Sequence, residues 1–186
     1  MDQASKQPIN ELINYWFTDP VKKLWFNSTP EFDEELRQKY LPLLEKAQRG
    51  ELDQWRDDPL GALGLVIILD QFPLNMFRGQ ARSFATEEQA RQVAEYAVGK
   101  GFDDQLNPAQ KAFLYLPFMH SEKLADQDKS VSLFEKAGLT DNLKYAHHHR
   151  GIIQRFGRFP HRNSILGRES TAEEIRYLNS KEAFLG

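Results

Sequence analysis

Apolar residues recur every three or four positions along most of the chain, the spacing that places them on one face of an α-helix. The spacing holds over residues 9–16 and over residues 32–44. The second series lies between Pro30, a frequent first helical residue, and Gly50, a frequent stop. No stretch alternates apolar and polar residues as a half-buried strand does. The pattern therefore predicts helices and no sheet.

The most apolar stretch begins at Pro59 and is apolar on every side through residues 63–69, which predicts a buried central helix. Proline has no backbone N–H, and its ring clashes with the preceding helical turn. We therefore expect Pro73 to limit the central helix, Pro42 to kink or divide the helix before it, and Pro117 to break a later one.

Two capping-box patterns mark later helix starts, Thr86 with Gln89 and Thr171 with Glu174. Helical spacing also covers three further segments, residues 107–117, 131–134 and 139–156. A loop rich in glycine, proline and asparagine follows at residues 157–163. The sequence predicts a single all-α domain over residues 1–186, with about seven to nine helices packed as antiparallel hairpins.

Composition excludes several classes of protein and of chemistry. The 186 residues are 40% hydrophobic and 27% charged, as in soluble globular proteins. The chain has no cysteine, so disulfides, thiol nucleophiles and cysteine-ligated metals are excluded. We find no phosphate-binding loop, dinucleotide fingerprint or hydrolase nucleophile motif, and we expect no cofactor.

Charge is unevenly distributed along the chain. The net charge is -3, yet residues 141–168 hold six basic side chains, one acid and four of the five histidines. A basic segment this short in an acidic chain, with no nucleic-acid-binding motif, argues against a nucleic-acid partner. It fits a small anionic ligand or the protein's own carboxylates.

The sequence also predicts where the protein resides. The first residues lack a basic flank followed by an apolar run, so they do not resemble a secretory signal. The strongly apolar run of residues 60–69 is too short to cross a bilayer. We expect a cytoplasmic protein without a membrane partner.

One polar motif, residues 70–79, follows the central helix directly and contains Asp70, Gln71, Asn75 and Arg78. Asp70 shares a helical face with apolar residues, so its carboxylate is expected to be half-buried at a helix C-terminus, where the helix dipole disfavours negative charge. A buried carboxylate needs a cation beside it. The arginines expected as its partner are Arg78, Arg155, Arg158 and Arg162, and the simpler interpretation is a structural ion pair.

Three consecutive histidines lie in the helix predicted over residues 139–156. They are spread by about 100° per residue, so they cannot converge on one ion from a single helix, and we expect no metal site. His149 falls on the face of Tyr145 and Ile152, His148 at its edge, and His147 on the other side. An inward-facing histidine is either a hydrogen-bonded core residue or a general base.

Residues 155–163 interleave guanidinium groups, aromatic rings and an imidazole, and the polar residues there are Arg155, Arg158, His161, Arg162 and Asn163. Such a segment can hold a small anion or pair with carboxylates of the same chain. Upstream, His120 and Glu122 form a His-x-Glu pattern, which in zinc deaminases requires cysteines that this chain lacks.

These motifs in this order, residues 70–79, 112–122, 155–163 and 165–170, resemble the bacterial family catalogued as domain of unknown function 924. The resemblance implies an all-α fold of tetratricopeptide-like helical hairpins and no known activity. It places twelve residues at the family's polar motif positions: Asp70, Gln71, Asn75, Arg78, His120, Glu122, His149, Arg155, Arg158, His161, Arg162 and Asn163. Leu74 departs from the pattern, because many members have a basic residue there.

The favoured hypothesis is that these twelve residues converge in one cleft, where Arg78, Arg155, Arg158 and Arg162 bind a small anionic ligand. Asp70 and Glu122 would orient the arginines, and His149 or His161 would transfer protons. The alternative is a helical scaffold that binds a protein segment, with the polar motifs as structural ion-pair networks. A hydrolase or transferase that activates water through a histidine and a carboxylate also stays open.

Overall fold

The computed structural model describes the backbone of residues 3–186 and the side chains of residues 6–186. Every regular element within this range is a helix or a helical turn, which confirms the predicted all-α class. The chain forms two compact units: unit 1 contains Met1–Arg78 and Arg82–Pro117, and unit 2 contains Gly79–Ala81 and Phe118–Gly186.

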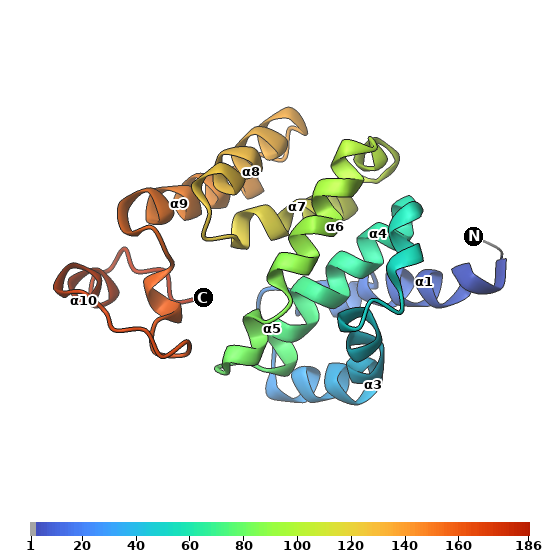
Figure 1. The fold of residues 1–186 in the computed structure, drawn as a ribbon, viewed down its shortest axis with the longest axis horizontal. Helices are drawn as coiled ribbons and strands as arrows, with labels where there is room; N and C mark the ends of the chain where they lie inside the picture. The colour runs from blue at the N-terminus through green and yellow to red at the C-terminus, as the bar shows by residue number, and fades with distance from the viewer. Residues whose placement is uncertain (1–2) are drawn as a thin grey trace. The chain divides into compact units, whose positions relative to one another are not determined.

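Figure 1 shows the helices of both units. Unit 1 contains α1 (Gln3–Trp16), α2 (Asp19–Lys22), α3 (Pro30–Gln48), α4 (Pro59–Val66), η2 (Ile67–Gln71), α5 (Phe72–Met76), α6 (Glu87–Gly99) and most of α7 (Pro108–His120), with short turns at Asp53–Asp57 and Phe102–Gln105. Unit 2 contains the end of α7, then α8 (Leu124–Lys136), α9 (Thr140–Phe156), a turn at Pro160–Arg162, and α10 (Ala172–Leu178). Another turn, Ala81–Phe84, crosses the boundary.

The core of unit 1 is built around Trp16, which is fully buried. Its ring makes edge contacts with Phe72 and Phe113, with centroid distances of 5.4 and 5.7 Å. The predicted central helix α4 packs closely on the preceding turn. A Cβ at Gly61 would lie 2.1 Å from the carbonyl oxygen of Trp55, so only glycine permits this approach.

The helices continue past Pro73 and Pro117, contrary to the prediction, and Pro42 does not divide its helix, although the kink predicted there stays a prediction. α3 continues through Pro42 to Gln48, and α7 continues through Pro117 to His120. The central helix passes Pro73 and reaches Met76 by way of η2, a π-helical turn. Pro73 has no N–H for the carbonyl of Leu69, and the Thr86 hydroxyl donates to that oxygen instead, at 2.5 Å. Tertiary contacts therefore replace the hydrogen bond that the proline removes.

This hydrogen bond also overturns one of the two predicted capping boxes. Thr86 precedes α6, but its side chain makes no cap bond, and Gln89 donates to the carbonyl of Gln48. The second capping box is confirmed: Thr171 accepts from the backbone N–H of Glu174, whose carboxylate accepts from the N–H of Thr171.

The helical segment Pro59–Met76 is longer than the apolar run of residues 60–69, because it continues past Pro73. Its 18 residues are enough, by length and composition, to cross a membrane. In the structure 83% of the segment is buried within the protein. A buried core helix passes the same test, so this segment is weak evidence for a membrane span.

In unit 2, α8 and α9 lie side by side as consecutive antiparallel helices (Figure 1). Gln127 on α8 is fully buried, and its amide donates to the carbonyls of Met119 and Ser121, at 2.8 and 2.7 Å. This fixes the C-terminus of α7 to α8. Gly157, with φ of 70°, ends α9 in the left-handed conformation and turns the chain into the arginine-rich motif.

Candidate functional site

The twelve predicted site residues are divided between the two units. Asp70, Gln71, Asn75 and Arg78 lie in unit 1, and the other eight lie in unit 2. The prediction that all twelve converge in one cleft stays a prediction.

Asp70 and Gln71 lie in the π-helical turn η2. The Asp70 carboxylate is 1% exposed and accepts from the Gln71 amide at 2.5 Å. Burial is therefore more complete than the half-burial predicted, and the predicted helix C-terminus is wrong, because the helical segment continues past Asp70 to Met76. Insertion of a π turn into an α-helix is often associated with a functional position. The guanidinium expected beside Asp70 stays a prediction.

Asn75 and Arg78 both bind Asp33, a residue that sequence reasoning missed. The Asn75 amide donates to Asp33 at 2.8 Å, and Arg78 Nε donates to it at 2.9 Å. Burial acts to raise the pKa of Asp33, but hydrogen bonds from Arg78, Ser28 and Asn75 outweigh it and hold the pKa below its usual value. Asp33 lies 45 residues before Arg78, so no local pattern could have indicated the pair.

In unit 2, Glu122 forms a half-buried ion pair with Arg168. Two nitrogens of Arg168 donate to the carboxylate at 2.7 and 3.0 Å, and the backbone N–H of Phe159 donates at 2.8 Å. Arg168 also donates to Asn163 Oδ1 and to the carbonyl of Phe159. Arg168 was not among the four candidate arginines, whereas Arg162, which was, also helps to lower the pKa of Glu122 by its charge. The prediction that Glu122 orients one of the four candidates stays a prediction.

Arg158 forms a bidentate ion pair with Glu174 at the start of α10. Its Nε and Nη2 donate to the two carboxylate oxygens at 2.7 and 2.8 Å, and Nη2 also donates to the carbonyl of Glu169. The Glu174 side chain is 2% exposed. The guanidinium of Arg158, the N–H of Thr171 and the side chain of Asn163 lower its pKa to about 2, against the opposing effect of desolvation. Glu174 stays charged because its hydrogen bonds are provided by the fold.

Arg162 and Asn163 are also buried in unit 2. Arg162 donates to the carbonyl of His120 at 3.0 Å, and its guanidinium lies 4.6 Å from the centre of the Phe159 ring. The Asn163 amide donates to the hydroxyl of Ser170. These contacts fix the turn after α9, and both residues take part in a polar interior.

His149 and His161 lie next to the rings of Phe159 and Phe184. Phe184 is 4.6 Å from His149 and 5.0 Å from His161, between ring centroids. Burial lowers the pKa of His149 to about 3 and that of His161 to about 4, so both imidazoles are neutral at pH 7. A neutral imidazole has no acidic proton to give readily, which argues against these histidines as general acids. Tyr145, expected on the same face as His149, is 61% exposed.

Arg155 differs from the other arginines of this motif because it borders an open groove. The groove has a volume of about 450 Å³, lies beside α9, and is lined by His147, His148, Gly151, Ile152, Arg155, Phe156, Tyr177 and Glu182. Arg155 Nε donates to Glu173 at 2.8 Å, and both side chains are half exposed. Its guanidinium lies 4.7 Å from the Phe156 ring centre and 5.9 Å from that of Tyr177.

Sequence reasoning missed most of this groove. His147 was placed on the far side of α9, and Tyr177 and Glu182 lie beyond the motif. The useful signal was the group of four histidines in residues 141–168, since two of them reach the groove. Among the side chains of residues 6–186, no three His, Asp or Glu groups are arranged to hold a metal ion.

Comparison with known proteins supports the family resemblance. No curated protein matches the chain. A solved structure, that of a protein of unknown function from Agrobacterium tumefaciens, is 38% identical, with a TM-score of 0.88 over 96% of this chain and 99% of the other. A family model described as "Bacterial protein of unknown function" matches residues 12–182. Because the match spans nearly the whole sequence, the chain belongs to this family, DUF924.

Proposed function

We propose that the protein binds a small anionic ligand in the groove beside α9, with Arg155 as the main cation. The observation that carries the proposal is the position of Arg155 in an open groove of about 450 Å³, a volume in the range of small-molecule sites. Two exposed histidines, His147 and His148, line the same groove and add hydrogen-bonding groups. The lining would therefore combine one permanent positive charge, two imidazoles and one carboxylate, that of Glu182.

Arg155 can exchange its ion-pair partner Glu173 for a bound anion. Ion pairs between exposed side chains contribute about 0–1 kcal/mol, so an incoming anion can replace Glu173 at little cost. Nε is the nitrogen that donates to Glu173, and no hydrogen bond from either Nη group is found among residues 6–186. The Nη groups can donate to two oxygens of a phosphate or carboxylate.

The aromatic side chains specify the rest of the ligand. Phe156 and Tyr177 line the groove and hold the Arg155 guanidinium over their rings. Planar apolar groups stack well against such a surface. The proposal therefore favours an anion attached to a planar or aromatic group over a bare inorganic ion. The proposal keeps the expectation of a cytoplasmic protein.

The buried arginines have a different role in this proposal. Arg158 with Glu174 and Arg168 with Glu122 act as structural ion pairs that fix the loop after α9. This adopts part of the alternative hypothesis, in which the polar motifs are ion-pair networks. The tetratricopeptide-like arrangement and a protein-binding role stay predictions of that alternative.

A thermal-shift screen tests the proposal with aromatic phosphates, aromatic carboxylates and inorganic phosphate as probes. We expect an aromatic anion to raise the melting temperature of the wild type and to leave that of Arg155→Ala unchanged. Arg150→Ala is the matched control, because Arg150 lies on the same helix and pairs with the exposed Asp128 outside the groove. Loss of the shift in both variants, or in neither, would overturn the assignment to Arg155.

A further inference from the structure

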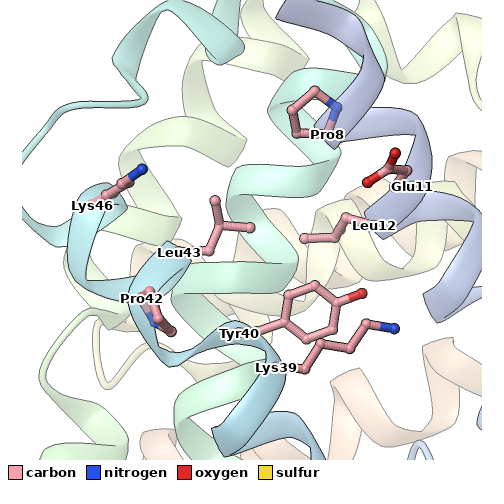
Figure 2. A pocket seen from close by; sticks show the side chains of 8 residues that line it. All are labelled: Pro8, Glu11, Leu12, Lys39, Tyr40, Pro42, Leu43 and Lys46. Carbon is pink, nitrogen blue, oxygen red and sulfur yellow. The ribbon is translucent and has the colours of Figure 1, made fainter.

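Unit 1 contains a second groove, between α1 and α3. The two helices meet where the Tyr15 hydroxyl donates to Glu35 at 2.8 Å and the Tyr15 ring lies 5.4 Å from that of Tyr40. Next to this contact lies a groove of about 510 Å³ (Figure 2). Figure 2 shows Leu12 and Leu43 extending toward each other across it from the two helices.

The floor of this groove is apolar. Leu12 and Tyr40 are buried, Leu43 is half-buried, and the rings of Pro8 and Pro42 are exposed at the rim. Burial, together with the nearby carboxylates of Glu11 and Glu35, raises the pKa of Tyr40 to about 12. The Tyr40 hydroxyl is therefore neutral at physiological pH, and the floor carries no charge of its own.

The charged residues at the groove are of both signs, and Glu35 lies beside it at the Tyr15 hydroxyl. Lys39, Lys46 and Glu11 line the groove, which amounts to two ammonium groups and one carboxylate. Lys39 Nζ lies 3.7 Å from the centre of the Tyr15 ring and is held there by a cation–π contact. Lys46 is exposed, and no hydrogen bond or ion pair of its ammonium is found among residues 6–186. Lys46 is therefore the cation available to a ligand.

The size of the groove argues for a small molecule rather than a protein partner. Stable protein interfaces involve about 20–30 residues on each side, whereas eight residues line this groove. Its volume of about 510 Å³ lies in the range of small-molecule sites. Lys39 and Lys46 are seven residues apart on α3, about 10 Å along the helix axis, so an extended molecule can lie between them.

We propose that this groove binds a single-chain amphiphile with an anionic head group. The alkyl chain would lie on Leu12, Tyr40 and Leu43, and the head group would lie beside the Lys46 ammonium. This site is in unit 1 and does not depend on Arg155 or the groove beside α9. The same chemistry is available from a free amphiphile and from the surface of an anionic membrane, and we assign the groove to the free amphiphile.

The first experiment is calorimetric titration of the full chain with dodecanoate below its micelle concentration. Dodecyltrimethylammonium has a similar chain with the opposite charge, and butanoate keeps the carboxylate but lacks the long chain. We expect dodecanoate to bind at least about tenfold more tightly than either, since both parts of the molecule contribute. No binding of dodecanoate, or equal binding of the cationic amphiphile, would overturn the proposal.

Matched charge reversals locate the site. Lys46→Glu should weaken dodecanoate binding at least about tenfold, because it places a carboxylate beside the head group. Lys23→Glu makes the same change at an exposed position of unit 1 outside the groove and should leave binding unchanged. Both substitutions are at exposed lysines, so the fold should be retained. Equal weakening by the two variants would reveal a general charge effect and contradict the site.

Vesicle flotation separates the two sources of an anionic chain. We expect no co-flotation with phosphatidylglycerol vesicles beyond that with phosphatidylcholine vesicles. Lys46-dependent flotation on phosphatidylglycerol, without binding of free dodecanoate, would overturn the assignment to a free amphiphile and identify a membrane-binding surface instead.

Discussion

Two ion pairs of unit 2 have the same chemistry and opposite surroundings. Arg155 and Arg158 are three residues apart, and their partners, Glu173 and Glu174, are consecutive on α10. The first pair is half exposed on both sides, whereas Glu174 is 2% exposed. Arg155 lies in the last turn of α9, and the left-handed Gly157 redirects the chain so that Arg158 reaches the buried carboxylate. Position relative to this glycine, rather than residue type, distinguishes the two pairs.

The difference in exposure gives the two ion pairs different roles, one in ligand binding and one in stability. An exposed pair contributes little because water screens it, so its arginine can bind a ligand without loss of the fold. Breaking a buried pair leaves a charge without compensation and destabilises the protein strongly. We therefore expect the motif of residues 155–163 to contain one arginine that binds and one that stabilises.

The largest expected effect of a single substitution comes from Glu174→Ala. Without this carboxylate, two hydrogen bonds donated by Arg158 and one donated by the N–H of Thr171 are lost. The free energy of unfolding should therefore fall by about 3 kcal/mol. Urea unfolding at pH 7 measures the change. Glu173→Ala is the control, with an expected change of no more than about 0.5 kcal/mol. Equal effects of the two substitutions would show that burial does not distinguish the pairs.

Acid should destabilise the protein through His149 and His161. Their folded pKa values of about 3 and 4 lie below the ordinary value of 6.5, so the unfolded chain binds protons first as the pH falls. Well above pH 6.5 neither state is protonated, and the histidines then have no effect on stability. Between pH 7 and pH 5 we expect each histidine to lower the free energy of unfolding by about 2 kcal/mol, which is about 4 kcal/mol for the two together.

Urea unfolding at several pH values measures this loss, and the double variant His149→Gln/His161→Gln should remove most of it. Glu174 acts in a lower window. Its pKa is lowered to about 2, so its contribution is complete above its ordinary pKa of 4.5 and is lost as the pH falls from there towards 2. A pH dependence that persists between 7 and 5 in the double variant would assign the acid sensitivity to other groups.

The same comparison of buried and exposed positions can be made for the hydrogen bonds of two threonines, Thr86 and Thr171. The Thr86 hydroxyl is buried and donates to the carbonyl of Leu69, whereas Thr171 is exposed and caps α10. Thr86→Val should cost about 2 kcal/mol because it leaves a buried carbonyl without a donor. Thr171→Val should cost about 1 kcal/mol, the usual value of an N-cap. The two variants are compared by thermal unfolding, and the reverse order would contradict the role of burial.

The sequence predicts helices more reliably than it predicts their partners. Apolar spacing and the cap at Thr171 correctly placed α1, α3, α9 and α10, because these signals act within a few residues. The prediction for Pro73 is wrong, because the Thr86 hydroxyl, which lies elsewhere in the chain, offsets the cost of this proline. Local spacing carries no information about such a contact.

The site was predicted in part for the same reason. The burial of Asp70 followed from one helical wheel, but the carboxylates that pair with the arginines did not. Glu122 and Arg168 are 46 residues apart, and Arg78 and Asp33 are 45 apart, so packing alone brings them together. Glu174 was identified for its cap and not for its ion pair. A capping glutamate that also accepts from an arginine cannot be recognised from the capping pattern.

The smallest expected change in stability, and the sharpest test of the exposed pair, is Glu173→Gln. The substitution removes the charge that competes for Arg155 and keeps the size of the side chain, so the free energy of unfolding should change by less than about 0.5 kcal/mol. An aromatic anion in the groove beside α9 should then bind up to about fivefold more tightly, the factor that corresponds to the energy of an exposed ion pair. Calorimetric titration of the probe found in the thermal-shift screen measures the change, and Arg155→Ala in the same background should abolish it. Weaker binding to Glu173→Gln would mean that Glu173 holds Arg155 in place for the ligand rather than competing with it, and the two pairs would then differ less than their exposure indicates.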